Sequence, residues 1–349
     1  MTSFGLLLRK NEKMEILRNA SLLAYNTFGI YAKADYFVEY ISVEELQELL
    51  QSELIKNNRL LAIGGGSNLL FLQDFKGVVL HSDIKSINIV LESADSVCLE
   101  VGAGVVWDDF VAYCVGNGWG GVENLSLIPG EIGASAVQNI GAYGVEVQDV
   151  ILEVNTIEVE NATIRKFTNV ECEYGYRESI FKNELKGKYL ITSVVFKLEK
   201  HPVFKLNYQH LEEEVLKNGL VDLKNIRHTI IAIRESKLPD PKVFGNAGSF
   251  FMNPVISRKQ FDSLLAQYPQ IPHYYVSETE EKVLAGWLID QCGWKGKQIG
   301  NAGVHDKQAL VLINKGGATG AEIVFLAEQI QASVKERYGI ELQPEVNYI

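Results

Sequence analysis

Two glycine-rich stretches carry the residue types that could bind phosphate groups. Gly64–Asn68 (GGGSN) directly follows a short apolar run, and Pro129–Gly144 sets four glycines among small residues with Glu131 as its only formal charge. Small residues let the backbone approach a ligand closely, and consecutive amides in a turn can surround phosphate oxygens. One such loop alone would more often be an ordinary buried turn. Two loops of the same kind favour a binding site.

Neither stretch matches a common nucleotide motif. The segment from Gly64 to Leu69 lacks the third glycine of GxGxxG, and the sequence contains no GxxxxGK[ST]. Both motifs depend on glycines at fixed spacing to hold a phosphate at a helix N-terminus. The pattern therefore argues against a Rossmann or a P-loop nucleotide site.

Arg177 is a candidate for binding a carboxylate. It stands in the segment YRES, and its planar guanidinium offers a two-pronged donor face that a lysine could not match. The alternative is an exposed arginine paired with Glu173 or Glu178, which would contribute little. Residue types alone leave both interpretations open.

Ser249 and Glu345 are candidates for proton transfer. Ser249 ends the loop GNAGS, where it could instead cap the following segment. No Ser-His pair occurs locally, which argues against a nucleophilic serine. Glu345 has the apolar neighbours Val346, Tyr348 and Ile349, which indicate a docked segment rather than a solvated one.

Length and composition restrict the class of protein. The 349 residues exceed one ordinary core and predict two or three compact units, and 47% hydrophobic with 22% charged residues is typical of a folded protein. A net charge of -11 argues against nonspecific nucleic-acid binding. An anionic ligand would need a local basic cluster, which four lysines late in the chain could form: Lys237, Lys242, Lys295 and Lys297.

The cysteines and histidines show no metal-ligand spacing, so we expect no metal site and reduced thiols in the cytoplasm. No apolar run is long enough to span a membrane. Apolar spacing predicts helices at 43–56, 107–117, 211–217, 258–268, 284–292 and 321–338. Runs of β-branched residues predict strands at 59–63, 77–81, 98–104, 150–159, 163–167, 189–198 and 309–314. This arrangement predicts an α+β cofactor domain rather than a doubly wound parallel sheet.

The sequence changes character at Glu235. Pro239 and Pro241 indicate a stiff linker, and the following loop opens a smaller α/β domain. Residues 1–20 read as an N-terminal extension.

Several motifs occur in one order along the chain, and together they resemble the UDP-N-acetylenolpyruvoylglucosamine reductase family from about Ala24 onward. The motifs are Asn26–Gly29, Gly64–Asn68, Pro129–Gly144, Tyr174–Ser179, Gly245–Phe251 and Pro344–Val346. Tyr208 lies in a segment that the shorter class of the family lacks, so the chain resembles the longer class.

The resemblance implies an FAD-binding domain of the vanillyl-alcohol oxidase (PCMH) type with lobes at 21–83 and 84–234. A substrate-binding domain at 235–340 and a C-terminal segment at 341–349 that returns to the active site would follow. NADPH would reduce the FAD, and UDP-N-acetylglucosamine enolpyruvate would then be reduced to UDP-N-acetylmuramate for bacterial peptidoglycan. The expected protein is a cytoplasmic monomer that contacts neither nucleic acid nor membrane.

The resemblance also implies residue roles. Arg177 would polarise the substrate carboxylate, Ser249 would protonate C2, and Glu345 would act with the arginine, either protonated or holding another donor. The expected FAD-binding residues are Gly64, Gly65, Gly66, Ser67 and Asn68 at the pyrophosphate and Pro129, Gly130, Ser135, Asn139 and Gly141 nearer the flavin. The expected substrate-binding residues are Tyr208, Lys237, Asn253, Tyr274, Lys295 and Gln308. Met252 and Asn347 replace a lysine and an arginine that are common in the family.

Neither glycine stretch contains a histidine or cysteine, so we expect the FAD to be non-covalent. Two alternatives remain at this point. A flavin oxidase of the same broader fold would share the glycine loops and take up oxygen with a sugar or alcohol. A nucleotide-sugar binding module without chemistry would bind UDP and show no flavin spectrum.

Overall fold

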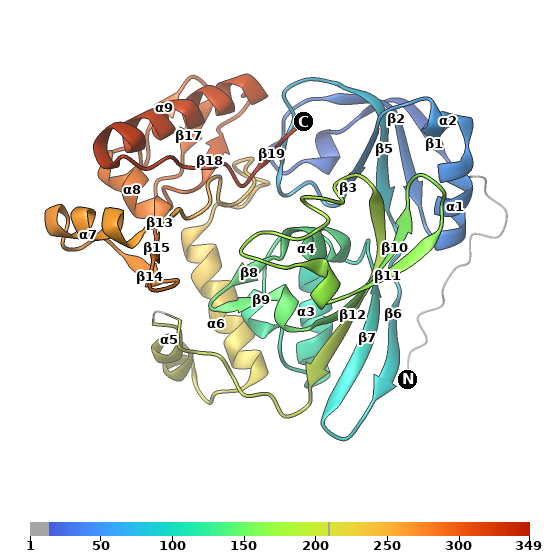
Figure 1. Cartoon of the computed structure of the whole chain (residues 1–349), viewed down its shortest axis with the longest axis horizontal. Coiled ribbons are helices and arrows are strands. Elements are labelled where there is room, and N and C mark those ends of the chain that lie inside the picture. The colour runs from blue at the N-terminus through green and yellow to red at the C-terminus, as the bar shows by residue number, and fades with distance from the viewer. Residues whose placement is uncertain (1–13, 209) are drawn as a thin grey trace.

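A four-stranded sheet forms the first lobe in the computed structural model, which describes residues 14–208 and 210–349 (Figure 1). Its strand order is β1 (Ile16–Ser21), β2 (Lys33–Tyr40), β5 (Phe75–Ser82) and β3 (Leu60–Ile63). Strands β2, β5 and β3 pair in parallel, and β1 joins β2 antiparallel. The helix predicted over 43–56 is two helices, α1 (Val43–Gln51) and α2 (Glu53–Lys56), because the Ser52 hydroxyl caps the second one.

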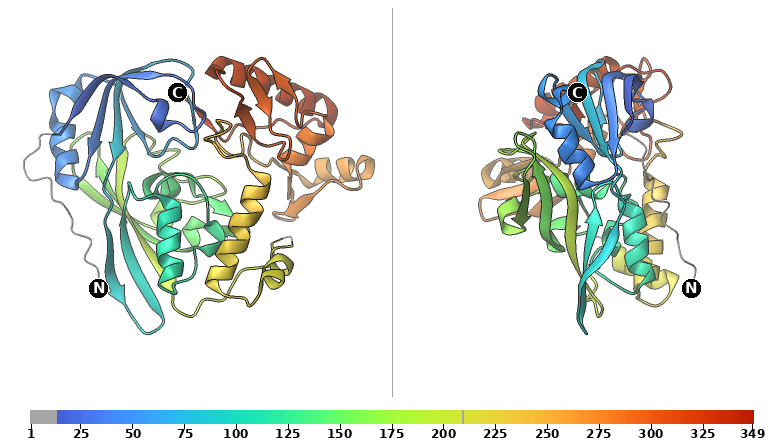
Figure 2. Two further views of the ribbon diagram at one scale, coloured as in Figure 1. Left: turned by 180° about the vertical axis from the view of Figure 1, so that it is seen from behind. Right: turned by 90° about the vertical axis from the view of Figure 1, so that its right-hand side faces the viewer.

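A five-stranded antiparallel sheet forms the second lobe. Its order is β11 (Ile164–Thr168), β10 (Ile151–Glu158), β12 (Tyr189–Glu199), β7 (Ser96–Gly102) and β6 (Ile87–Glu92). Helix α3 (Trp107–Gly116) packs on it through Trp107 and Phe110, whose rings meet Phe196 of β12. Seen from behind, α6 (Leu223–Lys237) runs beside α3 and leads to the C-terminal part (Figure 2). The α+β prediction is confirmed.

Two small sheets and three helices form the C-terminal part. One sheet has the order β13 (Val255–Ser257), β15 (Glu280–Val283) and β14 (His273–Tyr275), and the other β16 (Gln298–Ile299), β17 (Ala302–Val304) and β18 (Leu312–Asn314). The helices are α7 (Arg258–Gln267), α8 (Ala285–Gln291) and α9 (Gly320–Tyr338). All three helices lie within the predicted ranges, give or take one residue.

The remaining elements are short. They are α4 (Ile132–Gln138), α5 (Leu211–Asn218), β4 (Leu69–Leu70), β8 (Gly141–Ala142), β9 (Val145–Glu146), β19 (Asn347–Tyr348) and 3-10 turns at Leu23–Tyr25, Glu123–Leu125, Val147–Asp149 and Val170–Cys172. Among residues 14–208 and 210–349, no helix combines the length and apolar character needed to cross a bilayer. The same residues contain no group of three or more histidine, cysteine or acidic side chains placed to hold a metal ion.

Two boundaries differ from the sequence prediction. Residues 1–13 lie outside the described part, but Ile16–Ser21 of the predicted extension form edge strand β1, whose mostly exposed side chains gave no alternating pattern. The boundary expected at Glu235 falls inside α6. This helix was missed because its buried positions Ile226, Thr229 and Ile230 are few among charged residues. The Asp222 side chain caps its start, and it ends at Leu238, just before Pro239.

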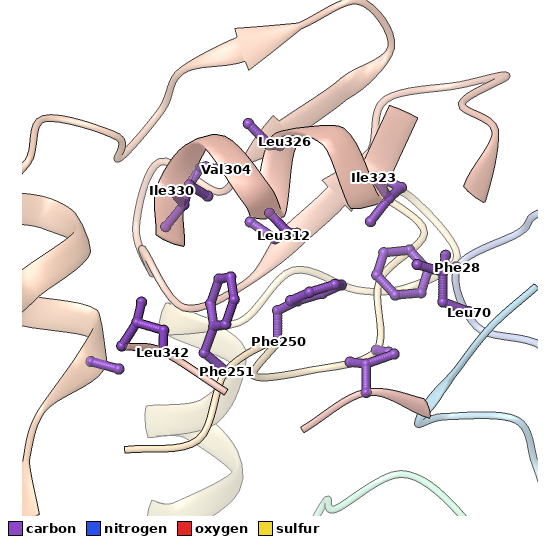
Figure 3. Packing of buried hydrophobic residues seen from close by; sticks show 14 of the residues in the cluster. Phe28, Leu70, Phe250, Phe251, Val304, Leu312, Ile323, Leu326, Ile330 and Leu342 are labelled. Atoms are coloured by element: carbon purple, nitrogen blue, oxygen red, sulfur yellow. The ribbon is translucent and has the colours of Figure 1, made fainter. Parts of the chain in front are cut away.

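The first lobe and the C-terminal part share one hydrophobic core (Figure 3). Phe28 and Leu70 of the first lobe lie in the same buried cluster as Phe250 and Leu312, and the Phe28 and Phe250 rings are 6.3 Å apart. Hydrogen bonds cross the same contact, from Thr27 Oγ1 to the Asn246 carbonyl (2.6 Å) and from Asn314 Nδ2 to the Phe28 carbonyl (2.9 Å). The two parts are therefore packed together rather than joined by a free linker.

Candidate active site

A cavity lies where the two lobes and the C-terminal part meet. Small residues and backbone form much of its wall, and the charged side chains are Arg177, Arg234, Glu131 and Glu345. The expected site residues that line it are Ser67, Asn68, Pro129, Gly130, Ser135, Gly141, Arg177, Ser249 and Glu345. The structure thus brings together residues that the sequence separates by up to 278 positions, from Ser67 to Glu345.

The two glycine stretches touch each other. The Ser67 hydroxyl donates to the Pro129 carbonyl at 3.1 Å, and a Cβ placed on Gly65 would lie 3.7 Å from the Gly130 Cα. Gly66 has a φ of +64°, and a Cβ there would lie 1.9 Å from the Tyr25 carbonyl oxygen, so only glycine fits. Gly64, Gly65 and Gly66 form the layer behind Ser67 and Asn68 rather than the cavity wall.

Half of the Pro129–Gly144 stretch is helical, where an exposed-backbone loop was expected. Helix α4 begins after Glu131 and ends at Asn139, which has a φ of +47°. Asn139 is fully buried: its Nδ2 donates to Glu146 Oε2 (3.0 Å) and to the Gly175 carbonyl (2.7 Å), and its Oδ1 accepts from the Gln148 amide. Its side chain connects the loops behind the cavity.

Arg177 and Glu345 form an ion pair inside the cavity. Arg177 Nε donates to Glu345 Oε1 at 3.1 Å, and the two side chains are only 16% and 15% exposed. The same oxygen accepts from Gln138 Nε2 at 3.1 Å, so Glu345 holds two donors. Of the two states expected for Glu345, protonated or holding another donor, this geometry fits the second.

The backbone fixes the direction of the Arg177 side chain. Arg177 has a φ of +59°, which is costly for a residue with a side chain. Its Nη2 donates to the Gly141 carbonyl at 2.7 Å and its Nη1 to the Asn139 carbonyl at 3.3 Å, while Lys182 Nζ binds the Arg177 carbonyl at 2.7 Å. The exposed-arginine alternative, with Glu173 or Glu178 as its partner, is therefore wrong.

Ser249 lies at the cavity edge after Gly248, which has a φ of +69°. Within the part of the chain that the structure describes, no hydrogen-bond partner engages its hydroxyl. The alternative role as a cap of the next segment is therefore not seen, and the hydroxyl is available to a ligand.

Among the cavity residues that sequence reasoning did not assign to the site are the side-chain donors Gln138 and Arg234. Gln138 sits one turn after Ala134 on α4, so the same helix face brings it to the cavity, a signal that helical spacing within the glycine stretch could have given. Arg234 projects from α6, and its buried Nε has no hydrogen-bond partner among the described residues. Burial lowers the pKa of Arg234, against the opposing charges of Tyr143 and Asp108. No local motif marks it.

The segment after Leu342 docks beside the first glycine stretch. Strand β19 pairs in parallel with β4, Asn68 Nδ2 donates to the Glu345 carbonyl at 3.2 Å, and the Glu345 amide donates to the Phe250 carbonyl at 2.8 Å. Asn347, in place of the common arginine, donates to the Asn68 carbonyl at 3.3 Å. In this structure the segment is therefore packed against the first lobe rather than solvated.

The expected substrate-binding tyrosines meet each other. The Tyr208 and Tyr274 rings stack at 5.8 Å with 21° between their planes, and Tyr143 packs edge-on against Tyr208. Burial raises the pKa of Tyr208, and a hydrogen bond to Tyr274 adds to the rise. This stack joins the α5 side of the molecule to strand β14.

Three of the other expected substrate residues surround α8. Asn253 Oδ1 accepts from the Ala285 amide (3.0 Å), Gln308 Oε1 lies 3.2 Å from a Cβ placed on Gly286, and Lys295 Nζ lies 3.4 Å from Asp290 Oδ2. Lys237 is exposed and is the last residue of α6, directly before the C-terminal part. These residues do not line the cavity itself.

Comparisons with known proteins agree with this layout. The family model described as an FAD binding domain matches residues 34–168, and that of the UDP-N-acetylenolpyruvoylglucosamine reductase C-terminal domain matches residues 240–349. The chain is 54% identical over 329 residues to the UDP-N-acetylenolpyruvoylglucosamine reductase of Bacteroides fragilis, covering 94% of this chain and 98% of that one. It is 49% identical to that of Flavobacterium johnsoniae, covering 96% and 100%.

A solved structure shares the fold. The crystal structure of UDP-N-acetylenolpyruvylglucosamine reductase from Thermus caldophilus superimposes with a TM-score of 0.66 at 21% identity, covering 96% of this chain and 98% of that one. With relatives this similar over nearly the whole length and both domain models in place, the chain belongs to the UDP-N-acetylenolpyruvoylglucosamine reductase family.

Proposed function

We propose that this protein reduces UDP-N-acetylglucosamine enolpyruvate to UDP-N-acetylmuramate with NADPH and a non-covalently bound FAD. The observation that carries the proposal is the fixed Arg177, Glu345 and Gln138 cluster in a cavity walled by two glycine stretches. The proposal places the enzyme in the cytoplasm, as a monomer.

The cavity fits FAD. Small residues leave room along the wall: Gly130, Ala134, Ser135, Gly141, Ala247 and Gly248. Arg234 offers a buried Nε–H that has no partner among the described residues. Such an orphan donor indicates a missing acceptor, which a phosphate-bearing cofactor could provide. Ser67, Asn68, Pro129 and Gly130 would hold it, with Gly64–Gly66 shaping the loop. Bound FAD would supply the hydride transfer from NADPH to C3 of the enolpyruvyl group.

Arg177 would stabilise the charge that develops on the substrate carboxylate when hydride adds to C3. Its guanidinium is held by the Gly141 and Asn139 carbonyls and needs no rearrangement, which is how a buried donor lowers a barrier. Glu345 would keep the guanidinium in this orientation, with Gln138 donating to the same carboxylate oxygen. An unpaired carboxylate at this position would repel the negative charge that forms on the substrate. The hydrogen bonds from Arg177 and Gln138 offset the charge of Glu345.

Ser249 would deliver the proton to C2. A serine hydroxyl is a weak acid, but the enolate formed at C2 is strongly basic, so a positioned hydroxyl can transfer its proton. Its place on the cavity edge without a partner in the described chain supports this role. The nucleotide part of the substrate would be held by Tyr208 from the second lobe and by five residues of the C-terminal domain: Lys237, Asn253, Tyr274, Lys295 and Gln308. This assigns cofactor binding to the two lobes and most of the nucleotide binding to the C-terminal domain.

The test follows the flavin spectrum under anaerobic conditions. Purified protein should show a flavin spectrum that bleaches with NADPH and returns when UDP-N-acetylglucosamine enolpyruvate is added. Colour that stays bleached after the substrate would contradict the reductase. Oxygen uptake with a sugar or alcohol would instead support the oxidase, and UDP binding without any flavin would support a binding module. Yellow colour that stays with the denatured chain would contradict non-covalent binding.

A further inference from the structure

A histidine joins two carboxylates behind the first glycine stretch. His81 of β5 is 7% exposed, with Nδ1 2.9 Å from Glu39 Oε1 and Nε2 3.0 Å from Glu131 Oε1. Glu39 comes from β2, and Glu131 immediately precedes α4. Elements from both lobes therefore meet at one imidazole ring.

The partners of His81 determine its protonation state. An ionised carboxylate can only accept hydrogen bonds, so two ionised partners require both ring nitrogens to donate, which only the imidazolium can do. Burial works against this charge, but the hydrogen bonds and charges of Glu131 and Glu39 outweigh it and raise the pKa of His81 above its ordinary value. Geometry and electrostatics agree on a cation.

The other ionisable groups around this cluster do not provide a second cation in contact with Glu131. The Tyr25 ring packs edge-on to His81 at 5.2 Å, and Tyr40 hydrogen-bonds Ser82. Lys85 Nζ lies 2.5 Å from Asp83 Oδ1, so its charge is already paired. Within residues 14–208 and 210–349, His81 is therefore the cation in hydrogen-bond contact with Glu131, while Lys85 acts on it only through space.

Glu131 faces the cavity. It lines the wall, its Oε2 lies 3.1 Å from a Cβ placed on Gly64, and its Oε1 lies 3.9 Å from one placed on Gly65. A carboxylate against this backbone is unexpected, because an unbalanced negative charge would repel a phosphate-bearing ligand. When His81 is protonated, its positive charge offsets the negative charge of Glu131 beside the Gly64–Asn68 loop.

We propose that His81 is a positioning residue for the cofactor: its imidazolium holds Glu131 against the Gly64–Asn68 loop and offsets its charge, so that the dinucleotide binds tightly only while His81 is protonated. The inference rests on the proposed function, because FAD is the ligand concerned. It adds a pH-dependent element to a wall for which the sequence predicted backbone amides and small polar side chains.

The direction of the pH effect follows from linkage. Above the pKa of His81 in the folded protein, the ring loses its proton and the cluster carries two uncompensated carboxylates. FAD affinity should therefore fall as pH rises through that pKa. By reciprocity, bound FAD should raise the pKa of His81, because it lowers the acid dissociation constant of the ring by the same factor by which protonation strengthens FAD binding.

The experiment measures FAD release from the diluted holoenzyme by flavin fluorescence, from about pH 6 to about pH 9. In wild type we expect the dissociation constant to rise on the order of tenfold across this range. His81→Gln should release FAD on the order of tenfold more readily at the low end and lose the pH dependence. His81→Gln with Glu131→Gln should restore affinity, because it removes the stranded charge. His201→Gln, an exposed histidine after β12, is the matched control.

Proton NMR titration of the imidazole in wild type, with and without FAD, keeps the test valid if His81→Gln does not fold. A pKa of His81 that FAD leaves unchanged would overturn the inference, as would identical pH profiles for wild type and His81→Gln. Those outcomes leave the proposed function intact if FAD is bound and reduced by NADPH. Protein that never binds FAD would instead remove the proposed function.

Discussion

The cavity and the proposed substrate-binding residues around α8 differ in how firmly their side chains are held. In the cavity, Arg177 and Glu345 are mostly buried and fixed by hydrogen bonds to each other, to Gln138 and to backbone carbonyls. Around α8, the Lys295 side chain is 38% exposed and pairs at 3.4 Å with Asp290, which is itself 43% exposed. Groups that act on a transition state gain from being placed in advance. A nucleotide can instead be bound by side chains that become ordered only when the ligand arrives.

From this contrast we expect the largest loss of activity when a cavity residue that takes part in the reaction is replaced. Ser249→Ala should slow flavin reoxidation by the enolpyruvyl substrate by on the order of 10²- to 10⁴-fold, because the proton donor is lost. Reduction by NADPH should stay within about twofold. Stopped-flow measurement of both half-reactions checks this, with Ser263→Ala, an exposed serine of α7, as control. Equal slowing of both halves would remove Ser249 as the acid.

Arg177→Lys should reduce kcat/KM by about 10²- to 10³-fold, since an ammonium cannot bind Glu345, the Gly141 carbonyl and a substrate carboxylate together. The thermal midpoint should change little, because lysine keeps a positive charge beside Glu345. Steady-state kinetics and thermal unfolding measure the two quantities. Arg165→Lys, on exposed strand β11, is the control. A loss seen mainly in stability would mean that Arg177 is structural.

Tyr208→Ala should act on the tyrosine stack outside the cavity, raising KM about tenfold while kcat stays within about twofold. The reason is that the stack on Tyr274 would contribute to binding the substrate rather than to the reaction. Tyr208→Phe keeps the stack and should raise KM by only about two- to threefold. Tyr31→Ala, at a ring that is 64% exposed, serves as control. A fall in kcat as large as that of Arg177→Lys would erase the contrast between the two regions.

Lys295→Ala should have the smallest effect, a rise in KM of about two- to threefold that disappears at high salt, as expected for an exposed charge. Kinetics at low and high ionic strength test this, and Lys335→Ala on α9 is the control. A salt-independent effect of about tenfold or more would show that Lys295 is held in advance for its ligand, in the same way as the cavity residues.

The sequence predicted which distant motifs lie at one site better than it predicted the local conformation of each motif. Arg177, Ser249 and Glu345 were assigned to one site from motif order, and the structure places all three at one cavity. The same reasoning could not show that Asn139 turns away from it, because that depends on partners at Gly175 and Gln148. Arg234 was missed because α6 has few apolar positions and only tertiary packing brings its end to the cavity.

The contact between Phe28 and the C-terminal part also bears on folding kinetics. Thr27 binds both the Gly66 carbonyl and Asn246, and Asn314 binds the Phe28 carbonyl across 286 positions of sequence. Such distant pairings close large loops and form slowly. We therefore expect FAD binding to appear late in refolding, after the sheets of the two lobes have formed. A chain released early from a chaperone would have its secondary structure but no cofactor.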